Sequence, residues 1–101
     1  MATTDKTQPL ADLTGFQRDL LAAVGANPGA KGLRLKEWME TAYGGQEVLH
    51  GKLYPNLDTL TELGLVEKAE ADGRTNSYRL TVRGERDLRD HAQWLFTGVS
   101  E

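Results

Sequence analysis

The sequence predicts a mainly α-helical domain that carries a two-stranded β-hairpin. Four segments repeat apolar residues at the spacing of a helix face, and strand-forming residues lie on both sides of Asp72-Gly73, between the third and fourth of these segments. At 101 residues, 39% of them hydrophobic, the chain suffices for one domain with one modest core. A membrane span is not expected, because no apolar run approaches the roughly 18 residues that it requires.

The first helix is expected to begin at Thr14, because Thr14 and Gln17 have the spacing of a capping box. Glycine, asparagine and proline in residues 25–29 end it near Ala26. Residues 1–12 lack a basic cluster followed by an apolar run, so we expect a short disordered lead-in rather than a signal peptide. The inward stripe of this helix is Phe16, Leu20, Ala23 and Val24.

The second helix is expected to run from about Arg34 to Tyr43 and to be closed by Gly44 and Gly45. Leu33 is placed on a short extended entry to this helix. Its inward stripe repeats the spacing of the first helix and consists of Leu35, Trp38, Met39 and Ala42.

A third helix is predicted over residues 50–63, and Gly64 is placed to end it. At about 100° per residue, Gly51, Lys52 and Pro55 fall on the side away from the core, and Asn56 lies nearer the core edge. Pro55 is tolerable near the first turn, where the N–H groups have no partner within the helix. The predicted core residues here are Leu53, Leu57 and Leu60.

The predicted hairpin covers residues 65–80, because Asp72-Gly73 suits the positive φ angles of a tight turn. Thr81 then caps a fourth helix. The apolar stripe of this helix, close to a heptad seam, exceeds what a small monomer covers, so we expect it to pair with a second copy of the chain. The alternative is packing against the first helix of its own chain. The predicted dimerisation residues are Leu88, Ala92, Leu95, Val99 and Trp94.

Three short helices followed by a hairpin describe a winged helix-turn-helix, here with a C-terminal dimerisation helix. The winged part would cover residues 13–81, and the dimerisation helix with its tail residues 82–101. In this architecture the third helix enters the DNA major groove, and the hairpin, or wing, touches the backbone or the minor groove. The residues predicted to contact DNA are His50, Gly51, Lys52, Tyr54, Pro55, Asn56, Lys31, Arg34, Arg74 and Thr75.

Several of these residues have a second interpretation. The basic ones also suit an ordinary solvated surface, and Tyr54 is as compatible with packing as with a phosphate contact. The low charge around Gly51 is still compatible with DNA, because free N–H groups and the helix dipole attract phosphate. A basic run near the fourth helix alternates with acidic residues, which predicts a solvated face. It consists of Arg79, Arg83, Arg86 and Arg89 with Glu85, Asp87 and Asp90.

Composition argues against several other functions. The net charge of -3 does not favour a general polyanion binder. The absence of cysteine excludes disulfides and thiolate zinc sites, and neither His50 nor His91 is followed by a second ligand at helical spacing, so no metal site is predicted. The sequence has no nucleophile elbow, P-loop or paired-carboxylate motif, which predicts neither an enzyme nor a cofactor.

The segments "GKLYPNLDTLTELGLVEK", residues 51–68, and "GRTNSYRLTVRG", residues 73–84, resemble the PadR-like family of winged-helix transcriptional regulators. The segments "LTGFQRDLL" and "HGKLYPNLDTL" are similar in sequence to small haloarchaeal members of that family. The resemblance implies a cytoplasmic, homodimeric DNA-binding repressor or activator, with no effector identified. The competing prediction is a protein-interaction module without DNA binding, which Asp58 and Glu62 on the outward face of the third helix would allow.

Overall fold

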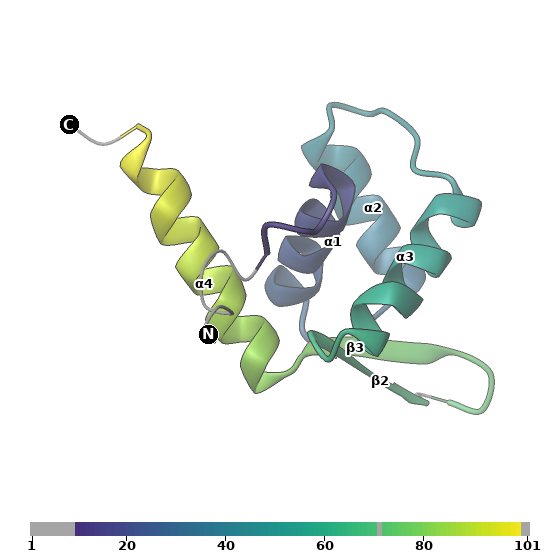
Figure 1. Cartoon of the computed structure of the whole chain (residues 1–101). Helices are drawn as coiled ribbons and strands as arrows, with labels where there is room; N and C mark the ends of the chain where they lie inside the picture. Colours follow the sequence, from purple (N-terminus) through teal and green to yellow (C-terminus); the bar gives the residue numbers. More distant parts are fainter. Residues whose placement is uncertain (1–9, 71, 100–101) are drawn as a thin grey trace.

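The computed structural model describes residues 10–70 and 72–99. Within these residues the chain forms four helices and a small antiparallel sheet of three strands (Figure 1). No helix in this described part is long and apolar enough to cross a membrane. The elements are α1 (Gly15–Ala26), β1 (Ala30–Lys31), α2 (Gly32–Ala42), α3 (His50–Glu62), β2 (Val66–Glu70), β3 (Asn76–Leu80) and α4 (Val82–Thr97).

Helix α1 confirms the predicted capping box. The Thr14 N–H donates to Gln17 Oε1 at 3.0 Å, and the Gln17 N–H donates to Thr14 Oγ1 at 3.1 Å, so both residues satisfy a donor that the helix leaves open. The helix ends at Ala26, and the Asn27 side chain closes it by donating to the Ala23 carbonyl at 2.8 Å. The local signals at both ends of this helix therefore work as the sequence predicts.

The core lies between α1, α2, α3 and the sheet, and it begins earlier in the chain than residue 13. Leu10 is 1% exposed and Leu13 is 8% exposed, and both belong to the buried cluster. The Leu10 carbonyl also accepts a hydrogen bond from Arg18 Nη1 at 3.0 Å. The expected lead-in over residues 1–12 therefore does not extend over residues 10–12, and its first nine residues lie outside the described part of the chain.

The sheet has one strand more than the predicted hairpin. Its order is β1-β3-β2, and Ala30 pairs with Tyr78 while Lys31 pairs with Ser77. Helix α2 starts at Gly32, so Leu33 belongs to the helix and not to an extended entry. A strand of two residues is too short to show an alternating pattern, which is why the sequence did not reveal β1.

Helix α4 starts against the sheet, and its C-terminal end points away from the rest of the molecule (Figure 1). Thr81 caps it as predicted, since Thr81 Oγ1 accepts from the Gly84 N–H at 2.9 Å. Leu88 is half-buried against the core, close to Gly25. Trp94 and Leu95, farther along, are each 55% exposed. The first half of the helix is therefore part of the folded core, and the second half is uncovered in a single chain.

Candidate nucleic-acid interface

Helix α3 separates a buried face from an open one. Leu53, Leu57 and Leu60 are fully buried, as predicted, whereas Gly51 and Pro55 are exposed on the opposite side. Pro55 is the sixth residue of a helix that begins at His50, so it lies beyond the first turn where the sequence placed it. It cannot donate to the Gly51 carbonyl, and because that carbonyl lies on the exposed face, water or a ligand donor can reach it.

Two of the predicted contact residues lean from α3 toward the start of α1. Lys52 Nζ lies 4.5 Å from the centre of the Phe16 ring, a cation–π contact. Asn56 accepts from Gln17 Nε2 at 2.9 Å and donates to the Lys52 carbonyl at 2.7 Å. Asn56 is half-buried, in agreement with its predicted place at the core edge, and Lys52 remains exposed.

Tyr54 lies on the other flank of α3, over the first turn of α2. A Cβ atom at Gly32 would lie 2.6 Å from Tyr54 Cε1, so the ring can rest there only because residue 32 has no side chain. The His50 ring meets Tyr54 edge-on, with the ring centres 5.6 Å apart. The two interpretations of Tyr54 are thus compatible, because the ring packs while the residue stays 36% exposed beside an open cleft.

That cleft separates α3 and the start of α2 from the wing. Its volume is about 320 Å³, and four of the residues predicted to contact DNA line it: Lys31, Tyr54, Arg74 and Thr75. The N–H groups at the start of α2 have no side-chain cap, since Lys31 is the N-cap residue and makes no capping hydrogen bond. The lining residues are Lys31, Gly32, Leu33, Tyr54, Arg74, Thr75, Asn76 and Tyr78.

The tip of the wing is tied to the start of α2 by Asp72. Its carboxylate lies 3.0 Å from Lys31 Nζ and also accepts from Thr75 Oγ1. The Thr75 hydrogen bond, then the Lys31 hydrogen bond and charge, hold the pKa of Asp72 below its ordinary value. Gly73 takes a φ of 83°, a positive value as predicted. The last strand pair is Glu70 with Asn76, so the connection is longer than the predicted tight turn, and Arg74 is exposed in it.

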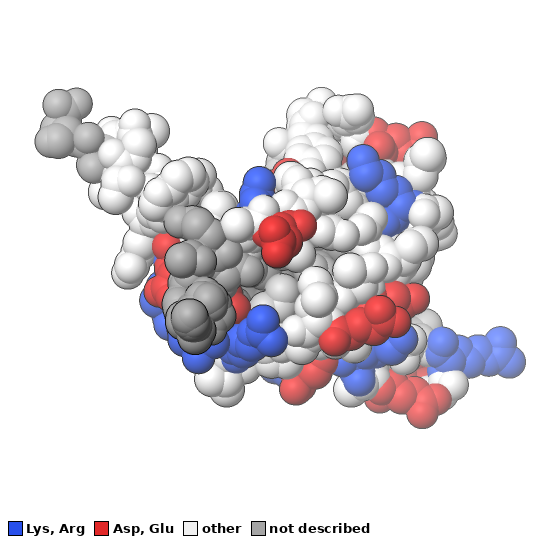
Figure 2. Space-filling view, in the orientation of Figure 1, with Lys and Arg blue, Asp and Glu red and all other residues white. Residues whose placement is uncertain are grey.

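Charges of both signs are mixed on this side of the molecule. Figure 2 shows acidic and basic side chains interspersed over the sheet and the wing rather than one basic patch. Asp58, on the outward face of α3, lies 3.4 Å from Lys68 Nζ of β2. The face therefore carries local pairs of opposite charge, which agrees with the net charge of -3.

One residue that shapes this surface was not among the predicted site residues. Glu40 Oε2 accepts from the Val48 N–H at 2.9 Å and lies 2.8 Å from Lys36 Nζ, so Glu40 fixes the segment that leads into α3. The Lys36 hydrogen bond and then the Val48 N–H lower the pKa of Glu40. The spacing of Lys36 and Glu40 is visible in the sequence, but the hydrogen bond to Val48 is not.

Comparison with known proteins identifies the family. The model of the transcriptional regulator PadR-like family matches residues 20–90. This chain belongs to that family. No curated protein sequence matches it.

Solved structures similar to this PadR-like chain are winged-helix regulators. One is the structure of H. salinarum RosR grown from NaBr. RosR is 44% identical to this chain, the match covers 88% of this chain and 79% of RosR, and the TM-score is 0.80. The complex structure of hsRosR-S1 is 45% identical, with 86% of this chain and 76% of that chain covered and a TM-score of 0.79. FabT of Streptococcus pneumoniae, in complex with DNA, is 19% identical, covers 87% of this chain and 58% of its own, has a TM-score of 0.72 and shares the fold alone.

These findings confirm the predicted resemblance and the winged helix-turn-helix fold, and they make the PadR-like chain a transcriptional regulator rather than an enzyme. RosR is a haloarchaeal regulator, in agreement with the predicted similarity to haloarchaeal members. The predicted two-stranded hairpin is present as β2 and β3, and β1 adds a third strand to the sheet.

A second surface of the PadR-like chain lies between α1 and α4. It is a groove of about 720 Å³. His91 stacks on Trp94 with ring centres 5.8 Å apart, and burial, then the Arg18 charge, lowers the pKa of His91. The groove contains four of the five predicted dimerisation residues, and Val99 lies beyond it. Its lining is Ala11, Gly15, Arg18, Asp19, Ala22, Leu88, His91, Ala92, Trp94 and Leu95.

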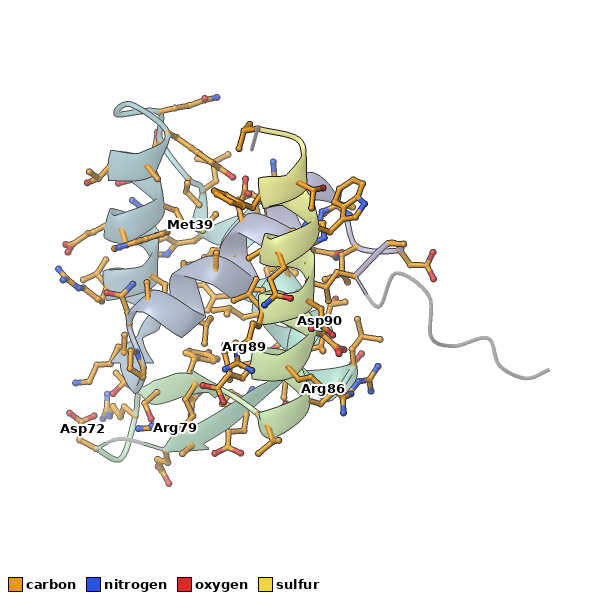
Figure 3. The ribbon with its side chains drawn as sticks, turned by 90° about the vertical axis from the view of Figure 1, so that its left-hand side faces the viewer. Met39, Asp72, Arg79, Arg86, Arg89 and Asp90 are labelled. Atoms are coloured by element: carbon orange, nitrogen blue, oxygen red, sulfur yellow. The ribbon has the colours of Figure 1, made fainter. Side chains whose placement is uncertain are left out.

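The predicted solvated face of α4 is corrected at one position. Asp87 is 3% exposed, although it alternates with arginines in the sequence. Its carboxylate lies 3.5 Å from Arg83 Nε and 3.3 Å from Arg86 Nε. Figure 3 shows the labelled Arg86, Arg89 and Asp90 along α4, well away from the wing turn at Asp72. Arg83, Arg86 and Arg89 therefore belong to α4 and its ion pairs, whereas Arg79 lies on β3 of the wing.

Proposed function

We propose that this PadR-like protein is a sequence-specific DNA-binding transcriptional repressor that acts as a homodimer in the cytoplasm. Helix α3 enters the major groove, and the wing lies on the backbone or in the minor groove. The observation that carries the proposal is the position of α3: its slim, open face at Gly51 and Pro55 lies beside the uncapped start of α2 and the wing, with a cleft between them.

Phosphate contacts come from the residues around that cleft and the start of α2. Lys31, Arg34 and Arg74 supply charge, and the Tyr54 and Thr75 hydroxyl groups supply donors. The N–H groups at the start of α2 add a positive dipole end, which attracts phosphate without further basic residues. This division explains how a chain with a net charge of -3 binds a polyanion through one local surface.

Base contacts come from the first two turns of α3. His50, Lys52 and Asn56 are the side chains there with donors that reach base edges in the major groove. Lys52 reaches DNA by leaving the Phe16 ring, and Asn56 by exchanging the Gln17 amide for a base. Gly51 and Pro55 keep the helix narrow at the point of closest approach.

Homodimerisation uses the uncovered half of α4. Trp94, Leu95 and Val99 expose apolar surface next to the α1–α4 groove of their own chain, so a second copy finds both a groove and the side chains to fill it. A two-fold pair of this kind presents two α3 helices about one turn of DNA, ~34 Å, apart. Two weak half-site contacts then combine into one useful affinity.

The comparisons support the proposal from two sides. The family is one of transcriptional regulators, and FabT, which shares the fold, was solved in complex with DNA. The second candidate function is a winged-helix module that binds a protein instead of DNA. The exposed Asp58 and Glu62 on the outward face of α3 favour it, because carboxylates repel phosphate.

The test is a selection of duplexes from a random library by the full chain, followed by fluorescence-anisotropy titration of the enriched duplex and a shuffled duplex over a range of potassium chloride concentrations. We expect a two-fold symmetric consensus and a shuffled duplex that binds at least about 100-fold more weakly. Equal binding of both duplexes at every salt concentration would contradict sequence-specific binding, and no binding of either would favour the protein-interaction module.

A further inference from the structure

The end of α3 and the start of α4 are joined through three successive backbone carbonyls. The Leu63 carbonyl accepts from Arg83 Nη1 at 3.2 Å, and the Gly64 carbonyl accepts from Thr81 Oγ1 at 2.7 Å. The Leu65 carbonyl accepts from the Thr81 N–H at 3.1 Å. Carbonyl groups at a helix C-terminus have no partner within the helix, so the first turn of α4 supplies donors to the end of α3. Arg83 also brings a positive charge to the negative end of the α3 dipole.

Two further residues fix this junction from the α4 side. Gly84 is buried, and a Cβ atom there would lie 2.9 Å from the Leu65 carbonyl carbon, so the α4 backbone rests directly on that peptide group. Asp87 is 3% exposed and lies 3.5 Å from Arg83 Nε, which orients the Arg83 side chain toward Leu63. We call Thr81, Arg83, Gly84 and Asp87 the brace.

We propose that the brace sets the direction of α4 relative to α3 and thereby the spacing between DNA half-sites that the dimer accepts. This inference rests on the proposed function, because it takes α3 as the helix that enters DNA and the far half of α4 as the dimer contact. Thr81, Arg83, Gly84 and Asp87 are positioning residues in this account. They lie on the path from one recognition helix to its copy in the partner.

The lengths involved make this junction sensitive. Helix α4 has 16 residues and is therefore about 24 Å long. A tilt of about 10° at its base moves its far end by about 4 Å, and one base-pair step of DNA is about 3.4 Å. A brace that limits the tilt to a few degrees therefore distinguishes half-sites whose separation differs by one base pair.

Arg83 and Arg89 form a matched pair for the experiment. Both are exposed arginines of α4 that lie within reach of an acidic residue of the same helix, Asp87 for Arg83 and Glu85, at 3.9 Å, for Arg89. Only Arg83 also donates to the α3 terminus in the described part of the chain. The variants Arg83→Met and Arg89→Met thus remove the same charge from the same helix, and only the first removes a contact of the brace.

The experiment titrates the full chain and both variants against duplexes that carry the half-sites selected by the wild-type protein. One set changes the spacer by -2 to +2 base pairs, and one duplex carries a single half-site. We expect a one-base-pair change to weaken wild-type and Arg89→Met binding by about tenfold or more, and Arg83→Met binding by about threefold or less. Single half-site affinity should stay within about twofold among all three proteins.

A second variant, Gly84→Ala, pushes α4 off the Leu65 carbonyl and should shift the preferred spacer rather than broaden it. Circular dichroism melting and sedimentation verify that each variant is folded and dimeric. A wild-type spacing profile in both Arg83→Met and Gly84→Ala would overturn the inference, as would an equal loss at the single half-site and the full site. Failure of the wild-type protein to select any duplex would instead overturn the proposed function.

Discussion

Helix α3 and the second half of α4 carry the same kind of apolar stripe, but only the stripe of α3 is covered by the rest of the chain. In α3, Leu53 and Leu57 are fully buried by other elements of the chain. At the end of α4 and just beyond it, Leu95 and Val99 have the same spacing of four residues but remain 55% and 77% exposed. The comparison teaches that a stripe identifies the face of a helix to be covered and does not identify which chain covers it.

The α3–α4 junction and the wing tip also differ in the polar contacts that hold them. The brace joins the first turn of α4 to the end of α3, 17 to 20 residues earlier in the chain, and it includes the buried Asp87. The wing tip is held by an exposed pair, Lys31 and Asp72, that water screens. One end of the molecule is thus fixed by several hydrogen bonds to backbone carbonyls, and the other by an exposed ion pair that a phosphate can replace at small cost.

The largest expected effect is on the stability of the covered core around α3. Leu57→Ala should lower the free energy of unfolding by about 2–5 kcal/mol, because it opens a cavity in a closed core. The matched change Leu95→Ala should alter it by less than about 0.5 kcal/mol at protein concentrations where the chain is monomeric. Chemical denaturation measures both. Similar losses in the two variants would show that Leu95 is covered by its own chain.

The next effect is on dimerisation through the uncovered second half of α4. Leu95→Glu should raise the dimer dissociation constant by about 100-fold or more, because an interface buries the new carboxylate without a partner. Val82→Glu, on the first turn of the same helix and 84% exposed, is the control for charge. Analytical ultracentrifugation over a concentration series gives both constants. A wild-type constant for Leu95→Glu would place the interface elsewhere.

The wing provides a third, smaller effect. Arg74→Ala should weaken DNA binding about three- to tenfold and reduce the salt slope by about one, because it removes one phosphate or minor-groove contact. Melting temperature should not change, since Arg74 is exposed at the tip. Arg89→Ala, on α4, is the matched control. An unchanged salt slope in Arg74→Ala would mean that the wing tip does not touch DNA.

The sequence predicts well what neighbouring residues decide. The capping box of Thr14, the α3 stripe and the positive φ of Gly73 all follow from local patterns, and the structure contains each of them. Strand β1 escaped prediction because its partner, β3, is distant in the chain and only two residues pair. Asp87 was placed at the surface because alternating charges show helical order but not which side chain the neighbouring elements enclose.

The same limit applies to the candidate site: the sequence predicts exposure within one helix but not contacts between elements. The exposure of Gly51 and Lys52 follows from the helical projection of α3 alone. The partners of Lys52 and Asn56, however, come from α1, and the ring of Tyr54 depends on the missing side chain of Gly32. These contacts require tertiary structure, so the sequence could name the residues without showing what each one touches in the free protein.

The smallest effect concerns Glu40, which holds the segment before α3 in the covered core. Its lowered pKa means that folding favours the ionised carboxylate, so this stabilisation is complete above the unfolded value of 4.5 and is lost as the pH falls through the lower folded value. Glu40→Gln should therefore melt below wild type at pH 7, and the difference should shrink below about pH 4.5. Glu37→Gln, on the same helix, is the control. A difference that persists at pH 3 would assign the effect to the Val48 hydrogen bond rather than to the charge.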